Sequence, residues 1–99
     1  MPTTQITPTS IGTSLNPTTP MQICPPNPSR SALIIHNPNP TGTIWVAPIG
    51  TVATAMGAGS FMIVAGADRT FADTTRATCG WMGIMGTGLG NVSVLEFVG

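Results

Sequence analysis

Residues 30–48 read RSALIIHNPNPTGTIWVAP, and this stretch decides the fold that the sequence predicts. Two short apolar runs, residues 32–36 and 43–47, are rich in isoleucine and contain a tryptophan. Between them, residues 37–42 (NPNPTG) combine Pro, Asn and Gly, which are the residues that tight turns require. Two β-rich runs joined by such a loop predict a β-hairpin, and we expect it to start a compact β-domain.

Further short runs, each followed by turn residues, continue this pattern. We expect strands at residues 51–55, 60–65, 69–72, 77–85 and 91–98, with an exposed loop or one helical turn at residues 73–76. Residues 60–65 are apolar enough to be buried on both faces. The last run alternates, so Val92, Val94 and Glu96 should share one face. Six or seven short strands predict an all-β fold, a small antiparallel β-sandwich or barrel of jelly-roll-like type.

Residues 1–29 have a different composition, with seven prolines and many Thr, Ser and Asn residues. Proline disfavours helix for itself and for the residue before it. We therefore divide the chain into an extended Pro/Thr-rich N-terminal arm, residues 1–29, and a compact β-domain, residues 30–99. Because an arm without a core is ordered only when something holds it, a neighbouring subunit is expected to do so. The expected partner-binding residues are the isolated apolar residues and the arginine at the root of the arm: Ile6, Ile11, Leu15, Met21, Ile23 and Arg30.

The charge content is very low. Only 6% of the residues are charged, the net charge is zero, and the sequence contains no lysine, whereas about 25% of an ordinary domain is charged. This composition provides no cluster of basic residues that would bind nucleic acid or anionic lipid. The N-terminus lacks the pattern of a signal peptide, and no stretch offers the ~20 predominantly apolar residues of a membrane helix.

Low charge indicates either a surface covered with Thr, Ser and Asn or a surface largely buried against other chains, and we favour a mixture in which burial against other chains dominates. The 70 residues of the expected β-domain form a core that rarely supplies more than ~3–5 kcal/mol. We therefore expect a homo-oligomer, with a trimer favoured. Apolar residues near the C-terminus are the candidates for its interface: Met82, Ile84, Met85 and Leu89.

The sequence supplies few parts of a catalytic site. His36 is the only histidine, and we expect it to be hydrogen-bonded at the end of a strand rather than paired with Cys79 as a catalytic base. Cys24 and Cys79 are far apart in sequence, and two buried free thiols are favoured over a disulfide. The prediction is a protein that is not an enzyme.

Metal and phosphate sites also lack their usual patterns. No CxxC or HxxxH cluster is present, and no lysine follows the glycine-rich residues 57–59 and 86–90. Asp68 and Asp73, with Arg69 between them, are favoured as a surface ion-pair network over a calcium site. We expect no cofactor, no metal and no small-molecule substrate.

The first predicted hairpin resembles a pattern of small bacteriophage virion structural proteins, the class that includes capsid decoration (cement) and minor capsid or tail proteins. Arg30, Leu33, Ile35 and Asn37 match its R-x-x-L-x-I-x-N strand, and residues 42–46 (GTIWV) match the strand that pairs with it. The resemblance extends loosely over residues 30–98. It implies a β-sandwich protein of a capsid surface, vertex or tail that acts by binding, with partners such as the major capsid protein.

Together these interpretations predict a structural virion protein that stabilises a capsid or virion assembly through β-domain oligomerisation and an extended arm. The alternative is a receptor- or carbohydrate-binding β-module of a phage spike or fibre. That alternative requires Trp45 or Trp81 to be exposed beside a polar groove. For each tryptophan the competing interpretation, which we favour, is a place in the core.

Overall fold

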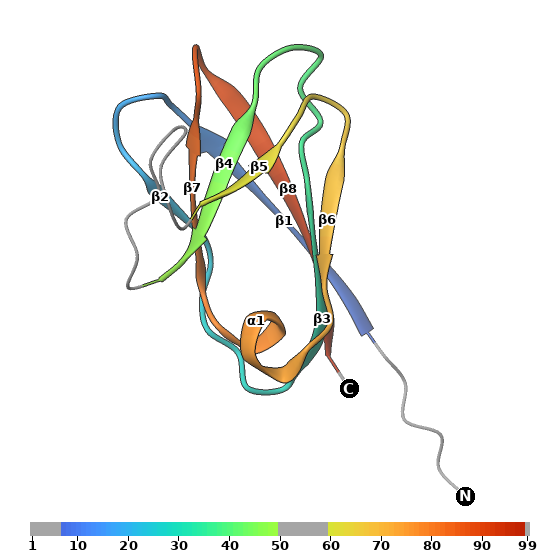
Figure 1. Ribbon diagram of the computed structural model, residues 1–99. Helices are drawn as coiled ribbons and strands as arrows, with labels where there is room; N and C mark the ends of the chain where they lie inside the picture. Colours follow the sequence, from blue (N-terminus) through green and yellow to red (C-terminus); the bar gives the residue numbers. More distant parts are fainter. Residues whose placement is uncertain (1–6, 50–59, 99) are drawn as a thin grey trace, which may run out of the picture.

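The computed structural model describes residues 7–49 and 60–98, which form two four-stranded antiparallel sheets packed face to face (Figure 1). Sheet A has the order β1 (Thr7–Leu15), β8 (Gly90–Val98), β3 (Arg30–His36) and β6 (Asp68–Phe71). Sheet B has the order β2 (Met21–Cys24), β7 (Trp81–Met85), β4 (Ile44–Pro48) and β5 (Phe61–Ile63). A short helix, α1 (Thr74–Thr78), connects β6 to β7. This strand order is that of a jelly roll, so the predicted all-β sandwich is confirmed.

The first correction concerns the N-terminal arm. Strand β1 pairs with β8 along nine residues, and β2 pairs with β7. Residues 7–24 therefore contribute two strands to the sandwich and are not an arm outside it. Residues 1–6 lie outside the described part of the chain. The expected boundary at residue 30 is therefore wrong. An edge strand with one buried face needs only an occasional apolar residue and tolerates proline, so its composition resembles that of an extended arm.

The second correction concerns the expected hairpin. Both predicted strands exist, but β3 lies in sheet A and β4 in sheet B, so they do not pair. The loop between them crosses from one sheet to the other. Leu33 and Ile35 point into the core from sheet A, while Ile44 and Val46 point into it from sheet B. The two β-rich runs that suggested a hairpin therefore belong to two facing sheets.

The crossing loop is organised by the fully buried side chain of Asn37. Its Nδ2 donates to the carbonyl oxygens of Gly42 (3.0 Å) and Ile63 (2.9 Å), and its Oδ1 accepts from the backbone N–H of Asn39 (3.0 Å). Gly42 has a φ of 95°, a conformation that glycine adopts without strain. One amide thus joins the β3–β4 loop to β5, which lies in the other sheet.

The remaining strand predictions are largely confirmed. Strand β6 and the helical turn α1 lie where they were expected, and Val92, Val94 and Glu96 share the inner face of β8. The apolar run at residues 60–65 forms only the short edge strand β5, so its predicted burial on both faces is wrong: Met62 is 45% exposed. Strand β7 begins at Trp81, and the strand expected at residues 51–55 lies outside the described residues.

The core fills the space between the two sheets. Its residues come from all eight strands or their immediate ends, and their inward alternation matches the pleat. The buried members are Leu15, Ile23, Cys24, Leu33, Ile35, Ile44, Val46, Ile63, Phe71, Trp81, Met85, Val92 and Val94. The core therefore depends on the N-terminal strands as well as on residues 30–98.

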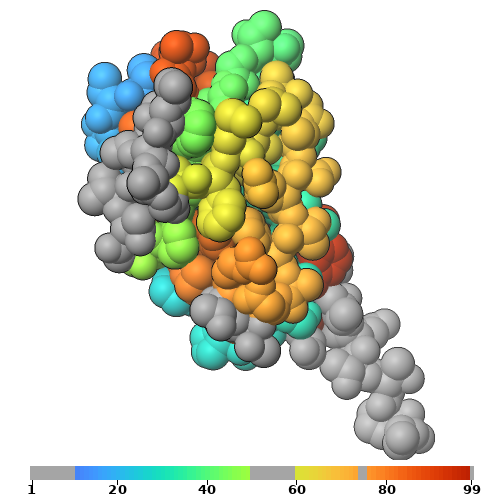
Figure 2. Space-filling model, viewed as in Figure 1, coloured from blue at the N-terminus to red at the C-terminus, as the bar shows by residue number. Residues whose placement is uncertain are grey.

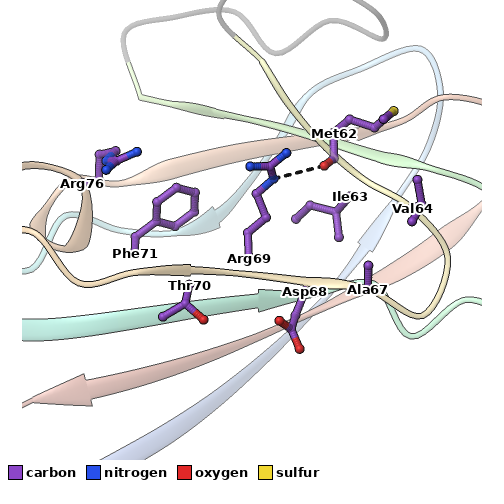
Figure 3. A pocket seen from close by; sticks show the side chains of 9 residues that line it. All are labelled: Met62, Ile63, Val64, Ala67, Asp68, Arg69, Thr70, Phe71 and Arg76. Carbon is purple, nitrogen blue, oxygen red and sulfur yellow. Dashed lines mark hydrogen bonds between the residues drawn. The ribbon is translucent and has the colours of Figure 1, made fainter.

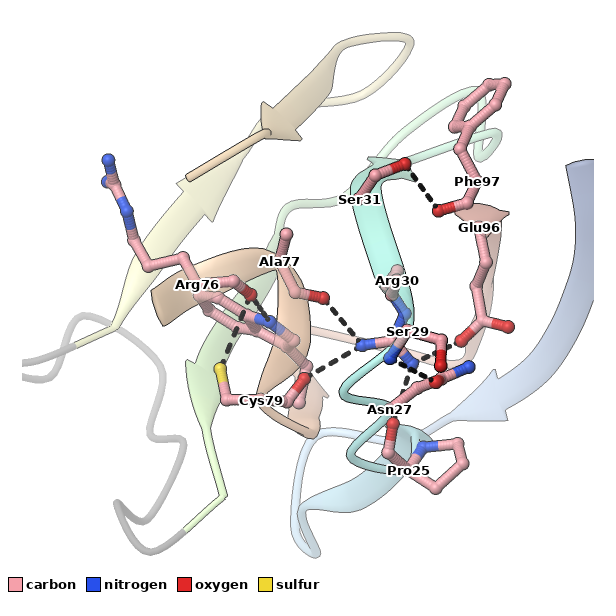
Figure 4. A network of polar contacts seen from close by, with 11 residues as sticks. Pro25, Asn27, Ser29, Arg30, Ser31, Arg76, Ala77, Cys79, Glu96 and Phe97 are labelled. Carbon is pink, nitrogen blue, oxygen red and sulfur yellow. Dashed lines mark hydrogen bonds and ion pairs between the residues drawn. The ribbon is translucent and has the colours of Figure 1, made fainter. Parts of the chain in front are cut away.

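One end of the sandwich is held together by a buried ion pair between Arg30 of β3 and Glu96 of β8 (Figure 4). The Arg30 side chain is fully buried, and its Nη2 contacts Oε1 of Glu96 and donates to the Pro25 carbonyl at 2.7 Å. Its Nη1 donates to the carbonyl oxygens of Ala77 and Cys79, both at 2.9 Å. A single guanidinium thus joins the β2–β3 connection, the α1–β7 connection and the end of β8.

We expect the Glu96→Gln substitution to lower the free energy of unfolding by about 3–5 kcal/mol, because it leaves the buried Arg30 charge without its counter-ion. Urea unfolding followed by circular dichroism measures this change. The matched control is the double variant Arg30→Met/Glu96→Met, which removes both charges and should recover most of the loss. A loss for Glu96→Gln no larger than that of a surface substitution, within about 0.5 kcal/mol, would contradict the role given to the pair.

The Asn37→Leu substitution should also destabilise the fold, by about 1–3 kcal/mol for each buried carbonyl that loses its donor. Leucine keeps the branching and the number of non-hydrogen atoms of asparagine but is larger, so overpacking adds to the loss of the hydrogen bonds to Gly42 and Ile63. The control is Thr41→Ala, an exposed position of the same loop. Equal unfolding midpoints for the two variants would show that the Asn37 amide does not hold the crossing.

Candidate functional site

The charged side chains of this protein fall into two groups. Arg30 and Glu96 form the buried pair. The other four, Asp68, Arg69, Asp73 and Arg76, are exposed and lie on β6, on α1 or between them. All six charged residues of the sequence belong to the described part of the chain. The whole side-chain charge available at the surface is therefore concentrated in one region.

This region borders a hollow of about 460 Å³ between the free edges of the two sheets, which we call the β5–β6 cleft. In Figure 2 the atoms of β5 (yellow) and β6 (gold) lie side by side, with α1 (orange) next to them. Figure 3 shows Arg69, Phe71 and Arg76 on one side of the β6 backbone, toward the cleft, and Asp68 and Thr70 on the other. This separation follows from the alternation of side chains along a strand.

An aromatic cluster lies next to the cleft, and one of its members, Phe71, lines it. The rings of Phe71 and Trp81 stack with centroids 4.5 Å apart, and Phe61 meets Phe71 edge to face at 5.7 Å. The guanidinium of Arg69 lies 5.4 Å from the Phe61 centroid, and that of Arg76 lies 5.6 Å from the Phe71 centroid. These are cation–π distances, so the rings help to fix both cations.

Hydrogen bonds fix the two guanidinium groups further. Nε of Arg69 donates to the Met62 carbonyl oxygen at 3.1 Å, across the cleft (Figure 3). Nε of Arg76 donates to Oδ2 of Asp73 at 2.6 Å, while the backbone N–H of Arg76 donates to Oδ1 of the same carboxylate. Among the described residues, no carboxylate pairs with Arg69. The network expected from the sequence joined Asp68, Arg69 and Asp73; among the described residues Asp73 instead pairs with Arg76.

The candidate catalytic residues are not brought together. Nδ1 of His36, at the end of β3, lies 3.1 Å from the carbonyl oxygen of Ala67. This contact is expected for a histidine that ends a strand. Sγ of Cys79 donates to the Arg76 carbonyl at 3.4 Å. Both cysteines are free thiols. Burial raises the pKa of Cys24 from 9.0 to about 11 and also raises the pKa of Cys79, so neither is an activated nucleophile.

Two further expectations concern ligands and membranes. Within the described ranges, no group of three or more His, Cys, Asp and Glu side chains is arranged to hold a metal ion. Asp73, one of the two carboxylates of the calcium alternative, is bound to Arg76. No helix in the described part of the chain is long and apolar enough to span a membrane.

The two tryptophans have different environments. Trp81 is completely buried, and its Nε1 donates to the Arg76 carbonyl oxygen at 3.0 Å, as its interpretation as a core residue predicts. Trp45 is half-buried and packs with Met82 against Ala47 and Ile84. Neither forms the exposed platform that carbohydrate binding through tryptophan requires.

The structure corrects most of the expected partner-binding residues. Leu15, Ile23 and Arg30 are buried within this chain, so they stabilise its own fold and cannot contact a neighbour. Ile11 is half-buried against the core, and Ile6 lies outside the described residues. Met21 remains exposed. A sequence cannot distinguish an apolar anchor for another subunit from a core residue of an edge strand, because both are single apolar side chains in extended chain.

The expected interface residues near the C-terminus also differ in exposure. Met85 belongs to the core and Ile84 is buried, whereas Met82 is half-buried. Leu89, in the β7–β8 turn, is 83% exposed. Of this set, only Leu89 presents a large apolar surface to solvent.

A second surface, which we call the outer face of sheet A, carries an apolar stripe, with Thr70 and the exposed Asp68 on the neighbouring strand β6 at its border. The stripe consists of Ala32 and Ile34 on β3 and of Leu95 and Phe97 on β8, all half-buried. Ala32 lies opposite Phe97, and Ile34 lies opposite Leu95. Sheet B and α1 both lie on the other side of sheet A (Figure 1), so no described element covers this face. The sequence predicts this face only indirectly, because its residues are those that alternate with the predicted core positions.

Comparison with known proteins supports the fold. No protein-family model and no curated protein matches the sequence. The stem and receptor-binding domain of spike protein P1 from bacteriophage PM2 is similar in structure, with a TM-score of 0.57 and 17% identity over 89% of this chain. This chain spans 32% of the length of that protein.

Two bacterial proteins are also similar. Protein NMB1881 from Neisseria meningitidis gives a TM-score of 0.53 at 10% identity, covering 93% of this chain and 80% of that one. A protein of the Bacillus endospore appendages, which form a family of disulfide-linked pili, gives a TM-score of 0.47 at 14% identity. The match covers 96% of this chain and 90% of that one. At such identities, the first two likenesses establish a shared sandwich fold and nothing further.

The buried thiols predict a specific loss of stability at alkaline pH. The unfolded chain releases the Cys24 proton near pH 9.0, whereas the folded chain keeps it to about pH 11, so the free energy of unfolding should fall as pH rises through this window. Because the sequence contains neither lysine nor tyrosine, few other groups titrate there. Urea unfolding at a series of pH values measures the slope.

The control is the double variant Cys24→Ala/Cys79→Ala, which should be less stable at every pH but should lose the alkaline slope. An unchanged slope in this variant would assign the alkaline loss to other groups.

Proposed function

We propose that this protein is a structural virion protein, a jelly-roll module that binds other subunits of a capsid, spike or tail. The observation that carries the proposal is the apolar stripe on the outer face of sheet A, formed by Ala32, Ile34, Leu95 and Phe97, which no described element covers. Apolar sheet faces of this kind are typical of subunit contacts. The jelly-roll order is also a fold that viral capsid domains use, which supports the proposal by analogy.

The first partner is proposed to be another copy of the same chain. The stripe is flat and uncharged, and Ser93 and Gly12 lie opposite one another beside it, so a second sheet can approach closely. A Cβ built at Gly12 would meet nothing within 4 Å. Packing of this stripe against a neighbouring copy around a three-fold axis would bury Ile34, Leu95 and Phe97 at the contact. We keep a trimer as the favoured homo-oligomer, located in a virion with contacts to proteins such as the major capsid protein.

The alternative, a receptor- or carbohydrate-binding module of a spike, is supported by the shared fold with the PM2 spike protein, whose solved part includes its receptor-binding domain. In this chain, however, Trp81 is buried and cannot stack on a sugar. The alternative therefore ranks below assembly.

The double substitution Ile34→Glu/Leu95→Lys tests the proposed interface. The two new charges lie directly opposite each other, so the pairing of β3 with β8 is kept while the stripe becomes costly to bury. We expect the native chain to form an oligomer by light scattering and the variant to approach the 10.1 kDa of one chain.

The charge-matched control is Thr19→Glu/Thr87→Lys, at two exposed positions outside sheet A, and it should keep the native mass. Unfolding midpoints of both variants show whether the fold is retained. A variant that keeps the native oligomer, or a native chain that stays monomeric at high concentration, would argue against this interface.

A further inference from the structure

We propose that the β5–β6 cleft is a docking site for an acidic peptide segment of a partner protein, with Arg69 and Arg76 binding its carboxylate. The site is distinct in residues and chemistry from the outer face of sheet A, so this inference goes beyond the proposed assembly function. Its starting point is that both solvent-accessible cations of the chain line the same hollow of about 460 Å³.

The cleft is locally positive although the chain as a whole is neutral. Asp68 is next to Arg69 in sequence, yet Figure 3 shows its carboxylate on the far side of the β6 backbone. Asp73 is already bound to Arg76 through both of its oxygens. No carboxylate of the described residues is therefore left to neutralise Arg69 inside the cleft. An incoming carboxylate would fill this role.

The two guanidinium groups are held in place before any ligand arrives. In each, Nε is used in a hydrogen bond, to the Met62 carbonyl for Arg69 and to Asp73 for Arg76. Each group also lies over a phenylalanine ring. The outer Nη atoms remain to donate to a ligand in the forked geometry that suits a carboxylate. Because the side chains are already oriented, less conformational entropy is lost on binding.

The border of the cleft favours a peptide over a sugar. Met62 and Val64 are 45% and 48% exposed and flank the arginines, and Met and Arg are enriched in protein interfaces. A sugar site would offer an exposed aromatic face, whereas Phe71 is buried and Phe61 is covered by Arg69.

The same contacts indicate how the peptide would bind. The Met62 carbonyl of the edge strand β5 is occupied by Arg69, so this edge is blocked for the addition of another strand. The segment is therefore recognised through its side chains, with an acidic residue on the arginines and apolar neighbours on Met62 and Val64.

The experiment uses the full ¹⁵N-labelled chain and the capped peptide acetyl-Leu-Glu-Leu-amide. The chain contains three arginines, so three Nε–H signals report on the cations separately. We expect the signals of Arg69 and Arg76 to shift with saturation, and that of the buried Arg30 to stay unchanged. Acetyl-Leu-Gln-Leu-amide, which differs only in the charge, should bind about fivefold more weakly or worse. Added salt should weaken the binding of the acidic peptide.

Variants locate the site. Arg69→Gln and Arg76→Gln should each remove most of the binding. Arg69→Lys keeps the charge but not the forked geometry of the guanidinium, so its affinity for the peptide should be intermediate. The matched control Asp68→Asn changes a charge on the opposite side of β6 and should bind at least as well as the native chain. Circular dichroism confirms that each variant keeps its fold, as expected for exposed side chains.

Three results would overturn the inference: no saturable shift at Arg69 and Arg76, equal binding of the Glu and Gln peptides, or unchanged binding by both Gln variants. Glucuronate and glucose are titrated in parallel. If glucuronate binds at the two arginines and the peptide does not, the ligand of the cleft is an acidic sugar and the peptide inference is wrong. The readout does not depend on oligomerisation, so failure here and failure of the sheet A interface are distinguishable.

Discussion

The buried contact between Arg30 and Glu96 is the constraint on which the rest of the structure depends. An ion pair taken out of water needs partners for its remaining hydrogen-bonding groups. Here the carbonyls of Pro25, of Ala77 in α1 and of Cys79 accept from the two Nη atoms, while the buried Nε of Arg30 has no partner among the described residues. The segments that contain these carbonyls lead into β3 and β7. The contact therefore fixes where α1 ends, and the carbonyl of Arg76 in α1 accepts from Trp81 and Cys79. Through this chain of contacts, the pair at one end of the sandwich also positions the aromatic cluster next to the cleft.

The sequence was sufficient for the type and place of most strands but not for their partners. Alternation and turn chemistry are local, so β3, β4, β6 and β8 were located correctly. The choice between a hairpin and a crossing between sheets depends on the Asn37 amide reaching the Ile63 carbonyl, 26 positions away, which no local pattern encodes. The arm was misassigned for the same reason, since β1 is defined by its pairing with β8 at the opposite end of the chain. Of the cleft, the sequence indicated a charged surface at Asp68, Arg69 and Asp73 but not the pairing of Asp73 with Arg76, and the contribution of Phe61 depends on β5 lying beside β6.

The surface separates two kinds of recognition. The four residues of the apolar stripe on sheet A carry no charge, so the contacts proposed there would depend on burying apolar area, which is strong but weakly selective. The β5–β6 cleft gathers the exposed charge of the chain, and charged groups contribute to the choice of partner and to the rate of encounter more than to raw affinity. The alternation of β6 separates its two charges: Arg69 points to the cleft, while Asp68 lies on the outer side of sheet A, at the border of the stripe, so the cations stay together in the cleft.

The inclusion of β1 and β2 in the sandwich also changes the reason to expect an oligomer. A core built from residues 30–99 alone would have needed other chains for stability. With residues 7–24 added, Leu15, Ile23 and Cys24 complete the core from within the chain, so association is not required to stabilise the fold. The argument for assembly then rests on the uncovered apolar stripe of β3 and β8 and on the low charge of the whole surface. Self-association would in that case be a function that the folded monomer supports, and the stripe can be altered without removing the residues that hold the sandwich together.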